Sequence, residues 1–503
     1  MTQGSGDGSA QLMPRPPHRV FGWIDRQLTT DARSLAVGRI GIALLLLYDL
    51  GLRASDLRAH YTDAGVLPRS LFQLRDWSFV WSFHEIAGGG GFQAFLFALA
   101  ALAGICLLVG YRTRAATLAS FLLALSVQGR NPFLHDGQDD LLRVLLFWGL
   151  WLPLGQRFSV DARCARLRAG AASTGTPDRV SGLLGFGLVG QLTLLYESSA
   201  IGKLQSAWWT HGNGVLHALE LGRYQTVLGQ WLTQFSGLLR LVNAPVIGLE
   251  LALPLLLWIP WQRERLRLLG VLLATALHTS FGLFLNLSIF PELCICAWWL
   301  LAPALAWSWR PARLATPAAG APPPPTTASG FWLALPLLAL AGLYVAGTHL
   351  DQPVLPPLAR RAVEALGLQQ YWVVFSPRNT QRVSDGYFVA PALLPDGREI
   401  DLFDGEGPVR WQPPRLGSRS FADTRWRHFY ANLIVEWARG SDQQRTTLAA
   451  REATVAWLCR DYQHRHPELP HPFRISLYFV EHSVDRPGDG EHRRLLDQNP
   501  CLP

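Results

Sequence analysis

Nine apolar segments of 15 to 24 residues constrain this chain more than any other feature of its sequence. They cover residues 34–50, 92–110, 114–129, 140–154, 180–203, 246–260, 268–286, 288–307 and 331–347. A helix needs about 20 apolar residues to cross the hydrocarbon core of a bilayer, so the shorter segments are expected to be tilted, re-entrant or longer than these boundaries. The pattern predicts a membrane all-α protein, a polytopic helical bundle of about nine spans.

The composition agrees with a protein that is surrounded by lipid. Of the 503 residues, 49% are hydrophobic and 16% are charged, whereas soluble domains average about 25% charged residues. The net charge of +8 is spread over short arginine clusters, and no long basic run predicts a nucleic-acid partner. Arginine-rich loops beside anionic lipid explain this charge, so the expected partner is the lipid bilayer.

The placement of arginine predicts the orientation of the spans. With the N-terminus inside, the predicted inside loops contain sixteen arginines and the outside connections seven. Positive charge is enriched in cytoplasmic loops. Nine spans then place the C-terminal domain outside the cytoplasm.

The polar parts of the chain divide it into domains. Residues 1–33 are expected to be a flexible N-terminal segment without a cleaved signal peptide, followed by the bundle at 34–307. Residues 308–330 form a Pro/Ala-rich linker, and 331–347 form the ninth transmembrane helix.

Residues 351–503 predict a small α+β soluble domain. "DGYFVAPALLPDGREIDLF" predicts a hairpin and "RISLYFVEHSV" a further strand, while "TRWRHFYANLIVEWARG" and "TTLAAREATVAWLCRDY" have helical spacing. Outside the cytoplasm, Cys459 and Cys501 can pair as a disulfide, and the sequence leaves this pairing open.

Lys203 is the one lysine among 45 basic residues and lies near the end of an apolar segment. Two interpretations stand side by side. The lysine either extends to the lipid headgroups as an anchor, or it performs proton chemistry that arginine cannot, because only lysine loses its proton when it is desolvated. Tyr196 and Ser199 share its helical face, whereas Glu197 lies on another face and is a less natural partner.

His278 lies in the middle of another apolar segment. An imidazole there must bind a polar partner or line a hydrated cavity. The sequence leaves open whether that partner is a ligand or the backbone of a neighbouring helix.

A cluster of polar residues begins the short segment 140–154, namely His135, Asp136, Asp139, Asp140 and Arg143. Asp139 and Asp140 suit the first turn of a helix, where the helix dipole favours carboxylates. One interpretation is a helix cap with an ion pair between Asp139 and Arg143. The other is a cluster that faces Lys203 across a shared cavity.

The remaining patterns exclude several classes of site. No P-loop is present, because Lys203 is followed by leucine. The C-terminal "HRHPELPH" has only weakly metal-like spacing, so no metal is predicted.

The spacing around these residues follows a known pattern. Tyr196 is followed by Lys203-Leu204 and then by Trp208, His278 stands thirteen residues before the proline of a Phe-Pro pair, and "FSVD" ends at Asp161. In these motifs the chain resembles the bacterial branch of the vitamin K-dependent γ-carboxylase family, whose members contain an HTTM (horizontally transferred transmembrane) domain. The resemblance covers about residues 30 to 310, and more loosely "QYWVVFSPRNTQRVSDGYFV".

The resemblance implies a γ-glutamyl carboxylase-like enzyme of the lyase class in the bacterial cytoplasmic (inner) membrane. Lys203 would be the base that deprotonates reduced vitamin K or menaquinol, assisted by His278 and Tyr196. O2 and CO2 would be co-substrates, and the acceptor a membrane or secreted protein. His135 lies near the position of a further family histidine. The alternative is a non-catalytic membrane protein that binds lipid or quinone, or acts in immunity or maturation support.

Overall fold

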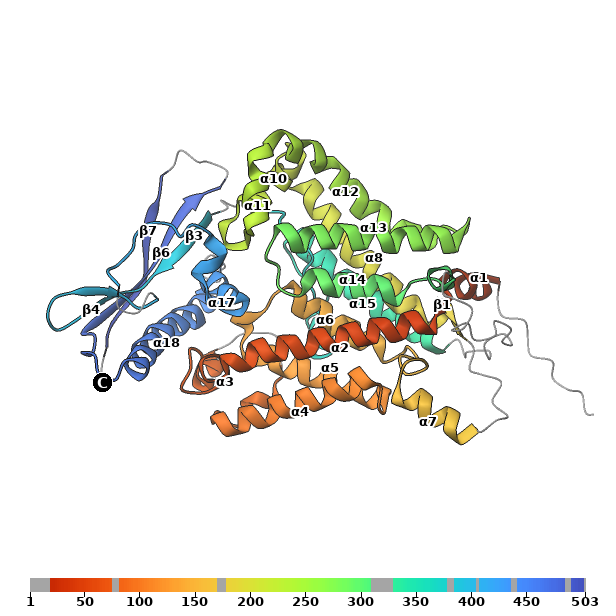
Figure 1. Ribbon diagram of the computed structural model, residues 1–503, viewed down its shortest axis with the longest axis horizontal. Helices are drawn as coiled ribbons and strands as arrows, with labels where there is room; N and C mark the ends of the chain where they lie inside the picture. Colours follow the sequence, from red (N-terminus) through yellow and green to blue (C-terminus); the bar gives the residue numbers. More distant parts are fainter. Residues whose placement is uncertain are drawn as a thin grey trace, which may run out of the picture.

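Long helices lie side by side along the length of the molecule and are capped at one end by a mixed helix and sheet region (Figure 1). The computed structural model describes residues 19–74, 81–169, 178–308, 329–377, 384–403, 407–435, 441–484 and 490–501. The helices of the bundle are α1 (Arg19–Leu28), α2 (Ala32–Ser55), α3 (Leu57–Tyr61), α4 (Gly90–Val109), α5 (Thr113–Arg130), α6 (Gly137–Gly149), α7 (Val160–Ala169), α8 (Gly182–Gln205), α9 (Ala207–Thr210), α10 (Gly214–Glu220), α11 (Val227–Leu232), α12 (Ser236–Trp258), α13 (Arg263–Phe284), α14 (Phe290–Leu300), α15 (Ser329–Leu350) and α16 (Pro357–Ala365).

Five helical stretches in the described part of the chain are long and apolar enough to cross a membrane. They are Ala32–Ser55, Gly90–Val109, Val227–Trp258, Arg263–Phe284 and Phe331–Leu350. Each coincides with one of the nine predicted apolar segments. The finding indicates a mostly helical membrane protein.

The other four predicted spans also coincide with helices, but these are shorter or more polar. They are α5, α6, α8 and α14. With 13 and 11 residues, α6 and α14 are only about 20 Å and 17 Å long, at 1.5 Å per residue. Almost every residue of α6 is buried, so this helix lies inside the bundle. The prediction of nine complete spans is therefore not confirmed.

The described part of the N-terminal segment, residues 19–33, is more ordered than predicted. Within the segment 1–33, residues 19–28 form α1, and β1 (Thr30–Asp31) pairs antiparallel with β2 (Arg179–Val180). Burial of Leu28 and Ala32 against the bundle explains this order, because apolar contacts offset the entropy of fixing the backbone. The predicted linker 308–330 lies almost wholly outside the described residues.

The C-terminal region forms an antiparallel sheet with two helices. Its elements are β3 (Ser384–Val389), β4 (Pro391–Leu393), β5 (Glu399–Asp401), α17 (Thr424–Val435), α18 (Ser441–Arg465), β6 (Arg474–Ser483) and β7 (His492–Pro500). The central strand is β6, which pairs with β7 on one side and with β3 and β4 on the other. The predicted hairpin is confirmed as β4 and β5, with Gly397 at φ +84° in the turn.

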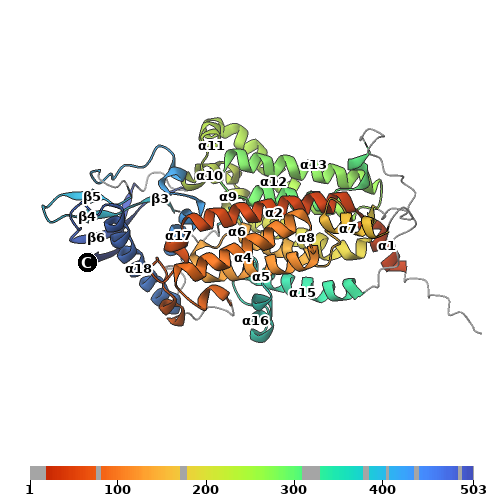
Figure 2. The ribbon, with the colours of Figure 1, turned by 60° about the horizontal axis from the view of Figure 1, so that its bottom comes forward.

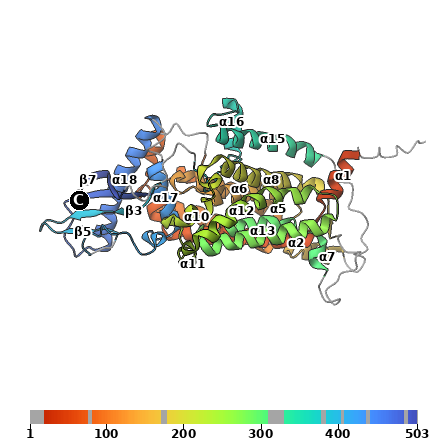
Figure 3. The ribbon, with the colours of Figure 1, turned by 90° about the horizontal axis from the view of Figure 1, so that it is seen from above.

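This region is less separate from the bundle than the predicted domain at 351–503. The sheet has its own core with α18, whereas Trp372 and the aromatic residues of α17 belong to the core of the bundle. The turned views place α17 between the sheet and the helices, with α15 and α16 along one side of the bundle (Figures 2 and 3). Cys459 of α18 and Cys501 form a disulfide, the pairing that the sequence left open.

Candidate functional site

A largely apolar cavity of about 440 Å³ lies inside the bundle. Helix α8 contributes Tyr196, Ser199 and Lys203, which share one face because they are spaced by three and four residues. Other walls come from α12, α13 and the extended segment around residue 374. The apolar part of the lining includes Leu195, Leu239, Val246, Leu277, Phe281, Phe284, Leu285, Phe290, Trp372, Val374 and Phe375.

Lys203 lies inside this cavity, and its ammonium group has three partners. Its Nζ donates to Ser199 Oγ at 2.7 Å and lies 3.0 Å from the carboxylate of Glu250 on α12. The same nitrogen lies 5.1 Å from the centre of the Trp209 ring. Both members of the ion pair are 4% exposed. This is the geometry of a buried pair and not of an anchor that extends to the headgroups.

A second polar group in the cavity links three helices. Trp298 Nε1 of α14 donates to the Tyr196 hydroxyl at 2.8 Å, and this oxygen lies 2.6 Å from His278 Nε2 of α13. Indole nitrogen can only donate, so the tyrosine oxygen accepts from Trp298. Between the hydroxyl group and Nε2, the imidazole tautomer decides which atom is the donor. His278 Nδ1 is buried without a partner among the described residues.

The structure thus brings together Lys203, Tyr196 and His278, the three residues predicted as catalytic, in the lining of one cavity. It does not place the predicted cavity residues His135, Asp139, Asp140 and Arg143 there. All four form contacts in other parts of the described structure.

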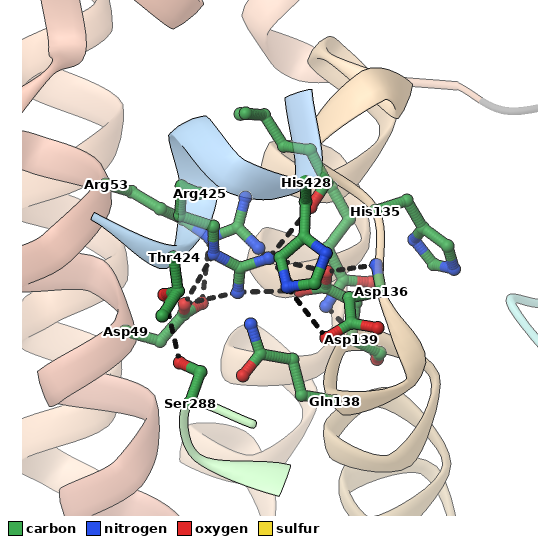
Figure 4. A network of polar contacts seen from close by, with 12 residues as sticks. Asp49, Arg53, His135, Asp136, Gln138, Asp139, Ser288, Thr424, Arg425 and His428 are labelled. Carbon is green, nitrogen blue, oxygen red and sulfur yellow. Dashed lines mark hydrogen bonds and ion pairs between the residues drawn. The ribbon is translucent and has the colours of Figure 1, made fainter. Parts of the chain in front are cut away.

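Asp139 belongs to a buried network that joins the bundle to α17 (Figure 4). It lies 2.5 Å from Arg53 Nη2 and 2.7 Å from Arg425 Nη1, and both arginines also pair with Asp49. Two arginines and two aspartates balance in charge. The expected pair between Asp139 and Arg143 is wrong, because Asp139 points to α2 and α17.

Arg143 pairs instead with Asp140, at 2.5 Å from Nη2 to Oδ1. Asp140 also lies 3.0 Å from His135 Nε2. Arg143 also donates from Nε to the Gly367 carbonyl oxygen at 2.7 Å and from Nη2 to the Gln369 carbonyl oxygen at 2.8 Å, while Nη1 donates to Gln128 Oε1 at 2.8 Å. These residues therefore hold the segment after α16 against α6. The expected helix cap is present, since Asp139 and the N-cap residue form a capping box at the start of α6.

Two residues in contact at the junction with α17, His428 and Asp136, have shifted pKa values. His428 Nε2 lies 3.0 Å from Asp136 Oδ2 (Figure 4). Burial lowers the pKa of His428. Burial also opposes ionisation of Asp136, but His428 and Arg427 outweigh it and lower the pKa of this carboxyl to about 2. Asp136 is therefore anionic at neutral pH.

A wider cleft of about 960 Å³ adjoins the cavity. Leu287, Phe290, Val374 and Phe375 line both spaces and form the wall between them. Phe375 has φ +51°, in the left-handed region that bulky residues seldom adopt. The cleft is more polar than the cavity and includes Asp136 among its lining residues.

Sequence reasoning missed Glu250, the ion-pair partner of Lys203, and Trp298, the donor to Tyr196. Glu250 is an acidic residue in the apolar segment 246–260, and the rule that an ionisable residue inside a span marks a functional site identifies it from sequence. No comparable signal marks Trp298, because tryptophan is frequent in this chain and common in membrane proteins.

No group of three or more histidine, cysteine, aspartate or glutamate residues in the described part of the chain is arranged to hold a metal ion. Comparison of the chain with protein-family models, with curated proteins and with solved structures found no match.

Proposed function

We propose that this protein is a membrane-embedded enzyme that deprotonates and oxidises a reduced quinone, with chemistry similar to that of γ-glutamyl carboxylase. One observation carries the proposal, the buried pair of Lys203 and Glu250 in the wall of an otherwise apolar cavity. A charge pair inside an apolar bundle is costly, and ionisable residues at such positions commonly serve proton or ligand chemistry.

The cavity fits a quinol headgroup in size and character. Its volume of about 440 Å³ lies in the usual range for small-molecule pockets, which are apolar with a few placed polar groups. A reduced quinone has an apolar ring system and two hydroxyl groups. Bound there, it would supply the electrons and, with O2, the strong base that removes a glutamyl proton before CO2 adds.

Lys203 and Glu250 can together accept a proton from a bound hydroxyl group. In this largely apolar cavity, transfer of the ammonium proton to Glu250 neutralises both groups and removes the cost of two buried charges. The neutral amine then takes the hydroxyl proton, and the carboxyl group keeps the first one. His278 Nδ1, which has no partner in the described structure, can form a hydrogen bond with the second hydroxyl group of the ligand.

The adjoining cleft supports a second, larger substrate. It is more than twice the volume of the cavity and shares a wall with it at Phe290 and Phe375. A membrane or secreted protein that presents a glutamate side chain is the acceptor we propose.

We place the protein in the bacterial cytoplasmic membrane with the N-terminus inside and the C-terminal region outside. The arginine distribution supports this orientation. So does the disulfide between Cys459 and Cys501, because disulfides persist in oxidising compartments. In Figure 1, α1 and the C-terminal sheet lie at opposite ends of the bundle, as this orientation requires.

A second function, non-catalytic binding of lipid or quinone, is favoured by the ion pair itself. If Lys203 stays protonated on Glu250, the pair only holds α8 against α12 and the cavity serves as a binding site. The two functions differ in whether the amine must lose its proton.

Purified protein incubated with reduced menaquinone, O2 and labelled bicarbonate tests the proposal. We expect oxidation of the quinol and, with a suitable acceptor peptide, incorporation of label. Saturable quinol binding without turnover would favour the non-catalytic function.

A further inference from the structure

A second cleft, of about 670 Å³, lies between the bundle and the C-terminal region, apart from the cavity that holds Lys203. One side is formed by α2 and the start of α14. The other is formed by the loop before α17 and the first turn of that helix. Ser288 and Thr424, whose hydroxyl oxygens are 3.3 Å apart, join the two sides (Figure 4).

The α2 side of the cleft is apolar and continues along a helix that is long enough to span a membrane. Leu45, Tyr48 and Leu52 line the cleft, and their spacing of three and four residues places them on one face. The Tyr48 side chain is exposed. Tyrosine with an apolar neighbour on each side is typical of a helix face at the membrane surface, where the ring contacts acyl chains and the hydroxyl contacts water.

The opposite side of the cleft is polar and carries positive charge. Arg419 is exposed, and Arg427 is buried with 2% exposure. In the described structure neither arginine forms an ion pair. Arg427 donates to the carbonyl oxygens of Asn286 and Arg223 at 2.7 and 3.4 Å, and its guanidinium lies 4.7 Å from the centre of the Tyr224 ring. A buried guanidinium without a counter-ion is costly, and an anionic group in the cleft would balance its charge.

Two carboxylates also line this cleft, Glu292 in the first turn of α14 and Asp423 just before α17. Asp423 accepts from the backbone N–H groups of Arg425 and Trp426 at 2.7 and 2.9 Å, so it is engaged at the start of α17. Glu292 is exposed and has no ion-pair partner among the described residues. The cleft therefore combines two arginines, a carboxylate engaged by the start of α17, a separate exposed carboxylate and an apolar wall that leads into the bilayer. That combination matches a headgroup with a phosphate and a primary amine.

We propose that this cleft binds a phospholipid with a primary amine, of the phosphatidylethanolamine type. The phosphate lies against Arg419 and Arg427, with hydroxyl donors from Ser288 and Thr424. The ammonium group binds Glu292, and an acyl chain follows the α2 face at Tyr48. Since the lipid contacts both α2 and the loop before α17, it links the C-terminal region to the membrane surface.

Lipid titrations of the purified full-length protein in detergent, followed by native mass spectrometry, test this proposal. We expect phosphatidylethanolamine to bind more tightly than phosphatidylcholine, which has no ammonium N–H, or phosphatidylglycerol, which has no amine. Glu292→Gln should lower the affinity for phosphatidylethanolamine about tenfold and abolish this preference. Arg419→Gln should weaken the binding of all three lipids.

Arg415→Gln is the matched control, because Arg415 is exposed on the same loop and does not line the cleft. It should leave the affinities unchanged, and thermal unfolding should show that all variants are folded. Equal affinity for the three lipids in the wild type, or an unchanged preference in Glu292→Gln, overturns the proposal. Glycerophosphoethanolamine binding as tightly as the lipid also overturns it, because the α2 wall would then contribute nothing.

Discussion

At the scale of single residues, hydrogen bonds and an ion pair among the polar side chains of the cavity hold them in place. The Tyr196 hydroxyl is central, since it accepts from Trp298 and forms a hydrogen bond with His278. Removing it leaves an indole N–H and an imidazole nitrogen unpaired inside the bundle, and an unsatisfied buried polar group typically costs about 1–3 kcal/mol.

We therefore expect Tyr196→Phe to lower the free energy of unfolding by about 1–3 kcal/mol, measured by thermal or denaturant unfolding in detergent. Tyr48→Phe is the control, because the Tyr48 side chain is exposed and surface changes usually stay within about 0.5 kcal/mol. Equal stability of the two variants would show that the Tyr196 hydroxyl is not engaged as described.

The residues of the cavity were partly predictable from sequence. Lys203 and His278 could be identified because ionisable residues are rare in apolar segments. Tyr196 could be identified because it shares a helical face with the lysine. Glu250 could have been identified by the same rule, but its pairing with Lys203 could not, because only the packing of α8 against α12 brings the two side chains together. For the same reason Arg143 was assigned the wrong aspartate, since spacing within a helix does not show contacts with α2 and α17.

At the scale of elements, a four-residue charge network fixes α17 to α2 and α6. Asp49, Arg53, Asp139 and Arg425 are each at most 3% exposed, and Arg425 contacts both aspartates. A buried network of this kind adds little net stability as a whole, but loss of one partner leaves an uncompensated charge.

Arg425→Met should therefore destabilise the protein by about 3–5 kcal/mol and expose α17 to limited proteolysis. Addition of Asp49→Asn to this variant should restore part of the loss, because it removes the excess negative charge and leaves Arg53 paired with Asp139. Arg465→Met is the control, since Arg465 pairs with Asp461 at the surface and exposed pairs contribute about 0–1 kcal/mol. Similar losses for the two arginines would contradict the role of the network.

All nine apolar segments contain helices in the structure, but the lengths of these helices were less predictable from sequence. Hydropathy cannot distinguish a lipid-facing span from a helix such as α6, which is apolar because other helices surround it. The C-terminal strands and helices followed from alternation and helical spacing. Their attachment to the bundle did not, because it depends on Trp372 and on the aromatic face of α17.

At the scale of the whole molecule, the orientation that we propose in the membrane rests on the arginine distribution. Reporter fusions test it. A reporter that folds only outside the cytoplasm should be active when it is fused after residue 350. A reporter that folds only in the cytoplasm should be active when it is fused near Gln262, between α12 and α13. A cytoplasmic reporter that is active after residue 350 would contradict the orientation.

The central claim is that Lys203 must lose its proton for the protein to act on a quinol. Lys203→Arg tests this claim most directly, because arginine keeps the positive charge and can still pair with Glu250, but it stays protonated under working conditions. The variant should first be shown to fold and to bind quinone like the wild type. A primary amine added to Lys203→Ala is expected to restore part of the activity.

The deciding measurement is the rate of reduced-menaquinone epoxidation by purified Lys203→Arg beside the wild type. The account predicts a loss of at least about 10²-fold, the low end for removal of a general base. Epoxidation by the arginine variant at the wild-type rate would contradict it and leave the Lys203–Glu250 pair as a structural contact between α8 and α12.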